Sequence, residues 1–204
     1  MSSSNFLTDL QPVLVADASF IINLNATARA SEIIKAIPSP IVITDNAYVE
    51  LVNGARNGHG DAKQLQGLLS IGLIQRVGLS AVGNSIYEGL VEGSALRTLD
   101  DGEAATIGYA HEVGGVAVID ERKARRLCSE DFPHLRVVST IDLLMLDAVG
   151  EALGDDGKIE AIVNALSTAR MRIPPEHLRR VVTLIGEERA AACTSLPRAA
   201  RTLA

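Results

Sequence analysis

The sequence predicts an α/β fold: a three-layer α/β/α sandwich around a central, mostly parallel sheet, followed by C-terminal helices. Two observations support this. The short apolar runs are unbroken and rich in valine and isoleucine, which is typical of strands buried on both faces of a parallel sheet. Segments with helical spacing of apolar residues lie between these runs, and such alternation favours a parallel sheet with helices on its faces.

Each predicted strand is one of these apolar runs. The runs at residues 13–16 and 115–119 are each followed directly by an aspartate. The run at residues 41–44 is β-branched and comes after two prolines. Residues 137–138 form a weaker run, and residues 73–77 are a candidate for one more strand.

The predicted helices carry apolar residues on one side. They are expected at residues 47–52, 61–69, 103–111, 122–128, 140–149 and 158–170, with one more beginning near the two prolines at 174–175. The segment 78–98 contains several glycines and serines and is predicted to be a loop. The glycines at 150 and 154 are predicted to interrupt the helical pattern.

The length of 204 residues fits one domain with a small appendage. We expect a lead at residues 1–11, a main domain at 12–150, a helical extension at 151–194 and a tail at 195–204. No signal peptide and no membrane span is expected, which makes the cytoplasm the default compartment. Two cysteines are too few for a disulfide framework.

The composition excludes some classes of function. Apolar residues at 47% and charged residues at 22% indicate a folded protein. A formal charge of −6 argues against a nonspecific DNA-coating protein, and 3% aromatic residues argue against a surface that stacks successive bases. The negative charge is concentrated in residues 1–120, which hold 13 acids and 6 bases, for a balance of −7.

Two aspartates stand directly after predicted buried strands. Asp17 follows the first strand and Asp120 follows the strand at 115–119. Ligands of open parallel sheets bind outside the carboxyl ends of the strands, so these side chains are candidates for one site. The alternative is that each aspartate caps the helix that follows it.

Two glutamates extend this set. Glu50 lies on a helix after the second strand, and Glu103 opens a helix just after Asp100 and Asp101. A solvated surface position for Glu50, and a favourable interaction of Glu103 with the helix dipole, are the alternatives. If the four acids converge, a divalent cation would relieve their repulsion, and oxygen ligands select Mg²⁺ or Mn²⁺. Such a cation can activate water for hydrolysis of a phosphodiester.

Several motifs resemble those of one family. D-A-S-F-I-I-N-L at 17–24 resembles the opening motif of PIN-domain ribonucleases, and V-I-T-D-N-A-Y-V-E-L, ending just past Glu50, is similar to the second motif. L-D-D-G-E-A-A-T-I-G-Y-A at 99–110 and V-A-V-I-D-E-R-K-A-R at 116–125 look like a branch with an L-D-x-G-E segment. I-P-P-E-H-L at 173–178 resembles the C-terminal helical extension of that branch, so the resemblance covers roughly residues 12–190.

The resemblance implies a PIN-like fold, with residues 12–150 as its catalytic domain, and a metal-dependent endoribonuclease. VapC-like toxins of toxin–antitoxin pairs belong to this group, which implies RNA as substrate, a small antitoxin as a possible partner, and a homo-oligomer. By position, the implied ligands of Mg²⁺ or Mn²⁺ are Asp17, Glu50, Glu103 and Asp120. Ser19 would orient Asp17 or a metal-bound water, and Asp100 would support the site.

A basic cluster follows Asp120 directly. It could hold the RNA backbone beside the metal, or form a solvated helix face; its members are Arg122, Lys123, Arg125 and Arg126. Two alternatives to the nuclease remain open. One is a catalytically weak PIN-like module that acts through protein contacts. The other is a metal phosphatase that uses the same carboxylates.

Overall fold

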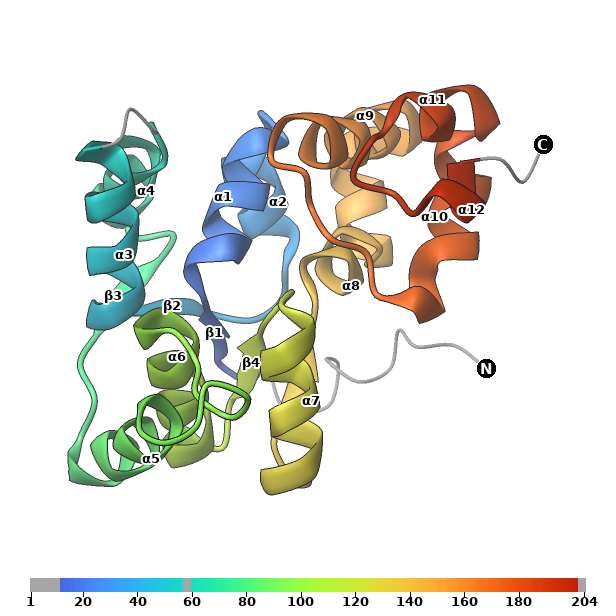
Figure 1. Cartoon of the computed structure of the whole chain (residues 1–204). Helices are drawn as coiled ribbons and strands as arrows, with labels where there is room; N and C mark the ends of the chain where they lie inside the picture. The colour runs from blue at the N-terminus through green and yellow to red at the C-terminus, as the bar shows by residue number, and fades with distance from the viewer. Residues whose placement is uncertain (1–11, 57–59, 202–204) are drawn as a thin grey trace. The chain divides into compact units, whose positions relative to one another are not determined.

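Five short strands form one sheet in which every strand pairing is parallel (Figure 1). The computed structural model describes residues 12–56 and 60–201. The strand order is β3-β2-β1-β4-β5, with β1 at Leu14–Ala16, β2 at Ile41–Thr44, β3 at Gln75–Val77, β4 at Val116–Val118 and β5 at Arg136–Val138. The predicted α/β class with a parallel sheet is confirmed, and the candidate strand near residues 73–77 is real.

Burial along the strands follows from their place in the sheet. Every residue of β1, β2 and β4 is buried, whereas the two edge strands are partly exposed. In the register, Leu14 pairs with Ile41 on one side and with Val116 on the other. Strands covered on both faces need continuous apolar sequence, which is the pattern that predicted them.

Helices lie between successive strands, including Ala18–Ala26 and Ala30–Ala36, which were not among the expected helices. Their bounds in chain order are α1 Ala18–Ala26, α2 Ala30–Ala36, α3 Asp45–Arg56, α4 Asp61–Ser70, α5 Ala81–Val91, α6 Asp101–Val113, α7 Arg122–Asp131, α8 Thr140–Leu144, α9 Asp147–Thr168, the 3-10 helix η2 Pro175–His177, α10 Leu178–Ile185, α11 Glu187–Ala192 and α12 Arg198–Arg201. None of the helices in residues 12–56 and 60–201 is long and apolar enough to cross a membrane.

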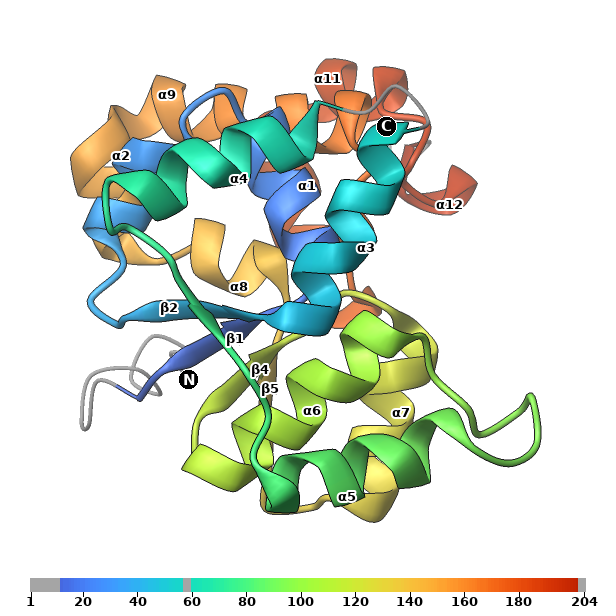
Figure 2. The same ribbon diagram turned by 90° about the vertical axis from the view of Figure 1, so that its left-hand side faces the viewer.

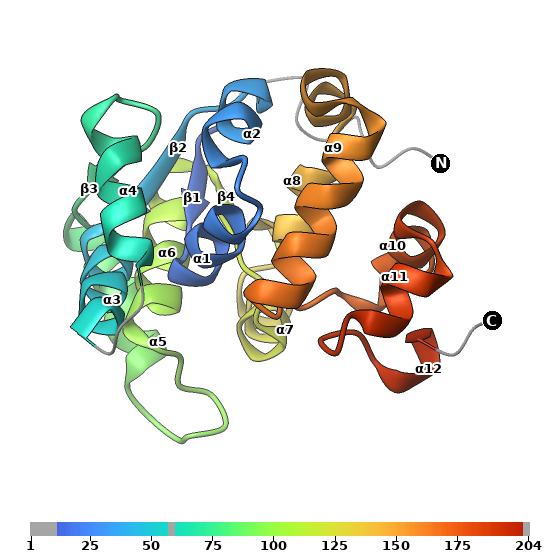
Figure 3. The same ribbon diagram turned by 90° about the horizontal axis from the view of Figure 1, so that it is seen from above.

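The chain divides into two compact units. Among the described residues, the first unit contains those up to Ile21 and those of Pro38–Val138, and the second contains Ile22–Ile37 and those from Ser139 onward. In the first unit, α6 packs on β1, β2 and β4, and α5 lies beside α6 (Figure 2). In the second unit, α2 and α10 pack against α9, and α10, α11 and α12 contact one another (Figure 3).

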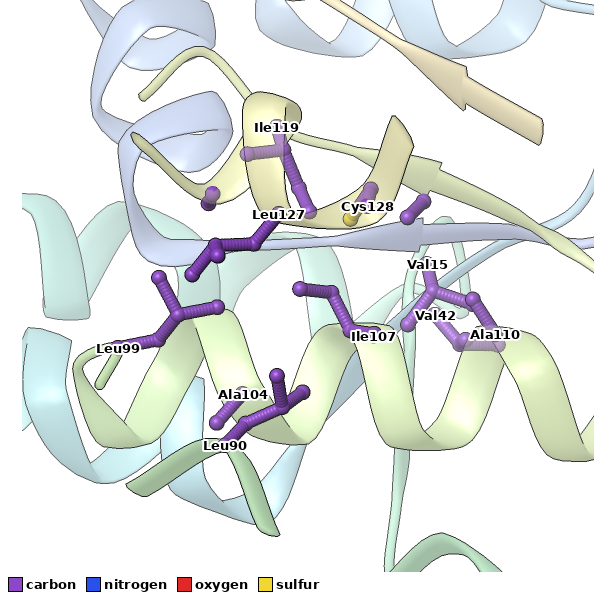
Figure 4. Packing of buried hydrophobic residues seen from close by; sticks show 12 residues of the cluster. Val15, Val42, Leu90, Leu99, Ala104, Ile107, Ala110, Ile119, Leu127 and Cys128 are labelled. Atoms are coloured by element: carbon purple, nitrogen blue, oxygen red, sulfur yellow. The ribbon is translucent and has the colours of Figure 1, made fainter. Parts of the chain in front are cut away.

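The core of the first unit joins the sheet to three helices. Val15 and Val42 from the strands pack with Ile107 of α6, Leu127 of α7 and Leu90 of α5 (Figure 4). These residues are at most 5% exposed. Burial of this apolar surface stabilises the strand ends from which the candidate site projects.

The prediction of a loop at 78–98 is wrong for residues 81–91, which form α5. The backbones of α5 and α6 come close at two glycines: a Cβ on Gly108 of α6 would come within 2.6 Å of the Gly83 carbonyl oxygen. The helix start is held by the Glu112 carboxylate, which accepts hydrogen bonds from the backbone N–H groups of Ser80 and Gly83 at 3.3 and 3.2 Å. Glycines that bring two helices together look like loop residues in the sequence.

Three smaller points concern the predicted segment boundaries. The predicted interruption after residue 149 is reduced to Gly154, whose φ of 71° and ψ of 166° break α9 locally. Residues Arg198–Arg201 form α12 inside the predicted tail, and Leu196 beside it is buried. The predicted lead at residues 1–11 lies outside the described residues, and the predicted division near residue 150 stays a prediction.

Candidate functional site

Asp17 and Asp120 lie at the carboxyl ends of two neighbouring strands. Asp17 follows β1 directly, and Asp120 comes two residues after β4, which pairs with β1. Both residues are buried, with 3% and 7% exposed. Burial raises the pKa of Asp17 well above its ordinary value, and the charge of Asp120 raises it further. The two aspartates therefore form a close, buried acidic pair.

Asp17 also caps the helix that it precedes. Its Oδ1 accepts a hydrogen bond of 2.7 Å from the Phe20 N–H, and its Oδ2 accepts one of 2.7 Å from the Ser19 hydroxyl. These bonds favour the ionised carboxylate and partly offset the effect of burial on its pKa. The capping alternative is thus correct for Asp17, and it coexists with the acidic pair.

Glu103 lies in the first turn of α6. Asp100 is the N-cap residue of this helix, and the Glu103 carboxylate accepts a hydrogen bond from the Asp100 backbone N–H. This is half of a capping box. The pKa of Glu103 is raised to about 7, first by burial and then by the charges of Asp100 and Glu50, while the hydrogen bond from the Asp100 backbone and the charge of Lys123 act in the opposite direction.

Glu50 reaches the same turn from α3. A Cβ on Gly102 would come within 2.2 Å of Glu50 Oε2, so the missing side chain at Gly102 makes room for this carboxylate. Burial raises the pKa of Glu50, and the charges of Asp100 and Asp101 add to it. The space taken by the Glu50 carboxylate therefore explains the glycine of the L-D-D-G-E segment, which the sequence alone does not explain.

The four predicted acids are linked electrostatically. Asp17 is affected by Asp120 and Glu103, and Glu103 is affected by Glu50. The set divides into a strand-end pair, Asp17 with Asp120, and a helix-start pair, Glu50 with Glu103. Within the described parts of the chain, no three histidine, cysteine, aspartate or glutamate side chains are placed so that they could hold one metal ion. The carboxylate oxygens of the four acids suit a hard divalent cation. All four could bind one ion only if the two pairs approach each other.

A groove adjoins the helix-start pair. It has a volume of about 660 Å³ and is lined by Asp45, Asn46, Val49, Glu50, Asn53, Val91, Leu99, Asp100 and Asp101. The Tyr87 hydroxyl donates a hydrogen bond of 2.9 Å to Asp101, which raises the pKa of Tyr87. The α3 residues of the lining recur at intervals of three and four, which is the spacing of one helix face. This spacing in the sequence could have indicated that they face one groove.

The basic cluster is largely engaged within the chain. Lys123 donates hydrogen bonds to the carbonyl oxygens of Ala95, at 2.8 Å, and of Thr98. Arg126 pairs with Glu130 at 3.1 Å. The remaining two members differ: Arg125 donates to the Ile119 carbonyl at 3.3 Å, and Arg122 is exposed and has no partner within residues 12–56 and 60–201. An RNA-binding role for these side chains stays a prediction.

Comparison with known proteins gives one family. A family model described as PIN domain matches residues 13–187. Neither the curated proteins nor the solved structures contain a match. PIN domains are in general nucleases that use divalent metal ions, which implies a nucleic-acid substrate.

Proposed function

Because this chain belongs to the PIN-domain family, we propose that it is an endoribonuclease that hydrolyses RNA phosphodiester bonds with Mg²⁺ or Mn²⁺. Asp17, Glu50, Glu103 and Asp120 would hold the ion. The observation that carries the proposal is that Asp17 and Asp120 are buried at the carboxyl ends of two neighbouring strands, while Glu50 reaches the first turn of the helix that carries Glu103. Like charges gathered at a sheet edge are costly without a cation to offset them.

The carboxylates would each perform a defined task. A divalent ion bound there supplies an activated water and offsets the charge that develops on the phosphate. Asp17 and Asp120 would bind it from the strand ends, with the Ser19 hydroxyl fixing the orientation of Asp17. Glu50 and Glu103 would bind from the helix side, supported by Asp100. The raised pKa of Glu103 means that the ion must displace a proton near neutral pH.

The groove beside the helix-start pair offers room for the substrate strand. It shares Glu50 and Asp100 with the proposed centre. Its acidic lining disfavours phosphates along its length, so bases rather than the backbone would face it. Arg122, an exposed cation two residues after Asp120, would contact the phosphate backbone of the RNA instead.

The biological setting proposed is that of a cytoplasmic toxin in a toxin–antitoxin pair, with a small antitoxin protein as partner and a homo-oligomeric state. This part rests on the resemblance of the motifs to the toxin branch. A short neighbouring reading frame for a small helical protein supports it, and a neighbourhood without one counts against it.

The activity is tested on the purified chain with RNA. We expect cleavage in Mg²⁺ or Mn²⁺, loss of cleavage in excess EDTA, and loss in Asp17→Asn. The asparagine still accepts the hydrogen bond from the Phe20 N–H, so the fold should persist. Glu187→Gln, at an exposed acid on α11, is the matched control and should cleave normally. Cleavage that survives in Asp17→Asn contradicts the mechanism.

A second candidate is a PIN-like module that binds metal weakly and acts through protein contacts. It is favoured by the lack of three ligating side chains around one point in the described residues. Calorimetry with Mn²⁺ separates the two candidates. Clear binding that disappears in Asp120→Asn supports the nuclease, and absence of binding supports the module.

A further inference from the structure

The loop at residues 92–98 joins α5 to α6 and is fastened to α7. Lys123 of α7 donates to two carbonyl oxygens of this loop, those of Ala95 and Thr98, the first at 2.8 Å. Arg126, one turn further along α7, donates to the Leu96 carbonyl at 3.3 Å. The bonds go to backbone atoms, so they restrain the path of the loop itself.

The loop makes further contacts with the same helix. Arg97 Nη2 donates to both carboxylate oxygens of Asp131, at 2.7 and 2.6 Å, and Arg97 Nη1 donates to Glu130 at 3.2 Å. At the end of the loop, the Leu99 N–H donates to the Leu90 carbonyl at 2.8 Å. Leu99 then packs in the core with Leu90 and with Leu127 of α7 (Figure 4).

Lys123 connects the chain segments that carry one member of each carboxylate pair. Its helix begins two residues after Asp120, which belongs to the strand-end pair. The loop that it holds ends two residues before Asp100 and five before Glu103, which belongs to the helix-start pair. The ammonium group is also close enough to Glu103 to favour its ionised form.

We propose that Lys123 is a positioning residue that sets the distance between the two carboxylate pairs by holding the carbonyls of Ala95 and Thr98. The clamp fixes the start of α6 against the start of α7, and so fixes Glu103 relative to Asp120. This inference rests on the proposed metal site. It assigns Lys123 to the assembly of that site rather than to contact with RNA.

The hydrogen-bond capacity of Lys123 supports this assignment. An ammonium group has three N–H donors, and two carbonyl oxygens already accept from this one. A phosphate contact would have to break these bonds or use the one donor that remains. Arg122 has no such engagement in the described chain and is the matched comparison on the same helix.

The test compares Lys123→Met, Lys123→Arg and Arg122→Met in the full chain. Three measurements are made: Mn²⁺ affinity by calorimetry, the rate of trypsin cleavage after Arg97, and RNA affinity in EDTA. We expect Lys123→Met to weaken Mn²⁺ binding by roughly tenfold or more, as loss of a group that orients ligands does. It should also speed cleavage after Arg97 and leave RNA affinity in EDTA unchanged. Lys123→Arg should restore Mn²⁺ binding in large part, and Arg122→Met should alter neither Mn²⁺ binding nor trypsin cleavage.

The outcomes separate this inference from the proposed function. Wild-type Mn²⁺ affinity in Lys123→Met, with reduced RNA affinity in EDTA, overturns the clamp and makes Lys123 a phosphate contact. Trypsin cleavage after Arg97 at the wild-type rate also overturns it. If the wild-type protein binds no Mn²⁺, the proposed metal site fails, and the positioning role fails with it whatever the digestion shows. If Lys123→Met is not folded by circular dichroism, Arg126→Met removes the neighbouring fastening and should produce the same two changes to a smaller extent.

Discussion

Gly102→Ala should lower the activity of the protein without lowering its stability. The new Cβ would come within 2.2 Å of Glu50 Oε2 and 3.4 Å of the Ala47 Cα. The second distance is an ordinary contact, whereas the first is impossible for real atoms. Glu50 is a flexible side chain, so its carboxylate can rotate away while the backbones of α3 and α6 stay in place.

The magnitudes follow from these distances. Relief of the clash to an ordinary contact of 3.4 Å requires the carboxylate to move by about 1 Å. A displacement of about 1 Å at a reacting centre can cost roughly 10²-fold in rate, so we expect RNA cleavage to fall by about that factor. The free energy of unfolding should hold or rise by up to about 1 kcal/mol, because alanine favours a helix over glycine.

Two assays and one control decide the outcome. Urea unfolding gives the stability, and cleavage of RNA in Mn²⁺ gives the activity. Gly89→Ala on α5 is the control, because its Cβ meets nothing within 4 Å, and it should leave cleavage unchanged. In a Glu50→Gln background, Gly102→Ala should lower the rate little further, since the two changes act on one group. Cleavage by Gly102→Ala at the wild-type rate would refute the claim that the position of Glu50 matters. A loss of several kcal/mol in the free energy of unfolding would refute the claim that Glu50 can move aside for the new Cβ.

Two other predictions concern ionisation and packing. The pKa of Glu103 is raised from 4.5 to about 7, so the folded state binds a proton more tightly than the unfolded state. The metal-free protein should therefore lose stability as the pH rises through that range, and Glu103→Gln should flatten this dependence in urea unfolding at about pH 5 and about pH 8. Gly108→Ala would bring a Cβ to 2.6 Å from the Gly83 backbone oxygen, which cannot rotate away. It should cost about 1–3 kcal/mol in the free energy of unfolding, in contrast to Gly89→Ala on the facing helix, and an unchanged urea midpoint would show that α5 and α6 separate easily.

The sequence predicted most accurately the elements whose pattern is local. The strands β1, β2 and β4 are fully buried, and their residues are apolar without interruption. The edge strand β3 was the weakest prediction because Gln75 and Arg76 are exposed and follow no such pattern. Helix α5 was missed because glycines at its contact with α6 look like loop residues, although Leu90 of the same helix packs in the core.

The candidate site divides in the same way. Asp17 and Asp120 could be found because each stands at the end of a buried strand, and Glu103 because it opens a helix. The closeness of Asp17 and Asp120 follows from the rule for parallel strands, whereas the approach of Glu50 to the start of α6 could not be predicted, because it depends on contacts between distant segments. Lys123 shows this most clearly, since the carbonyl groups that it binds lie 28 and 25 residues earlier in the chain.

Helix capping and metal binding are compatible roles for Asp17 in this structure. A carboxylate offers about four acceptor positions, and two are used, by the Phe20 N–H and the Ser19 hydroxyl. Those two bonds fix the orientation of the group while its remaining lone pairs stay available, and burial beside Asp120 raises its need for a cation. The cap is therefore compatible with the ligand role proposed for Asp17. Asparagine keeps an oxygen acceptor for the Phe20 N–H, whereas its amide nitrogen cannot accept a hydrogen bond from the Ser19 hydroxyl. Asp17→Asn therefore removes the charge and the bond from Ser19 and leaves the helix cap in place, so that a loss of cleavage does not come from the loss of the helix that the residue begins.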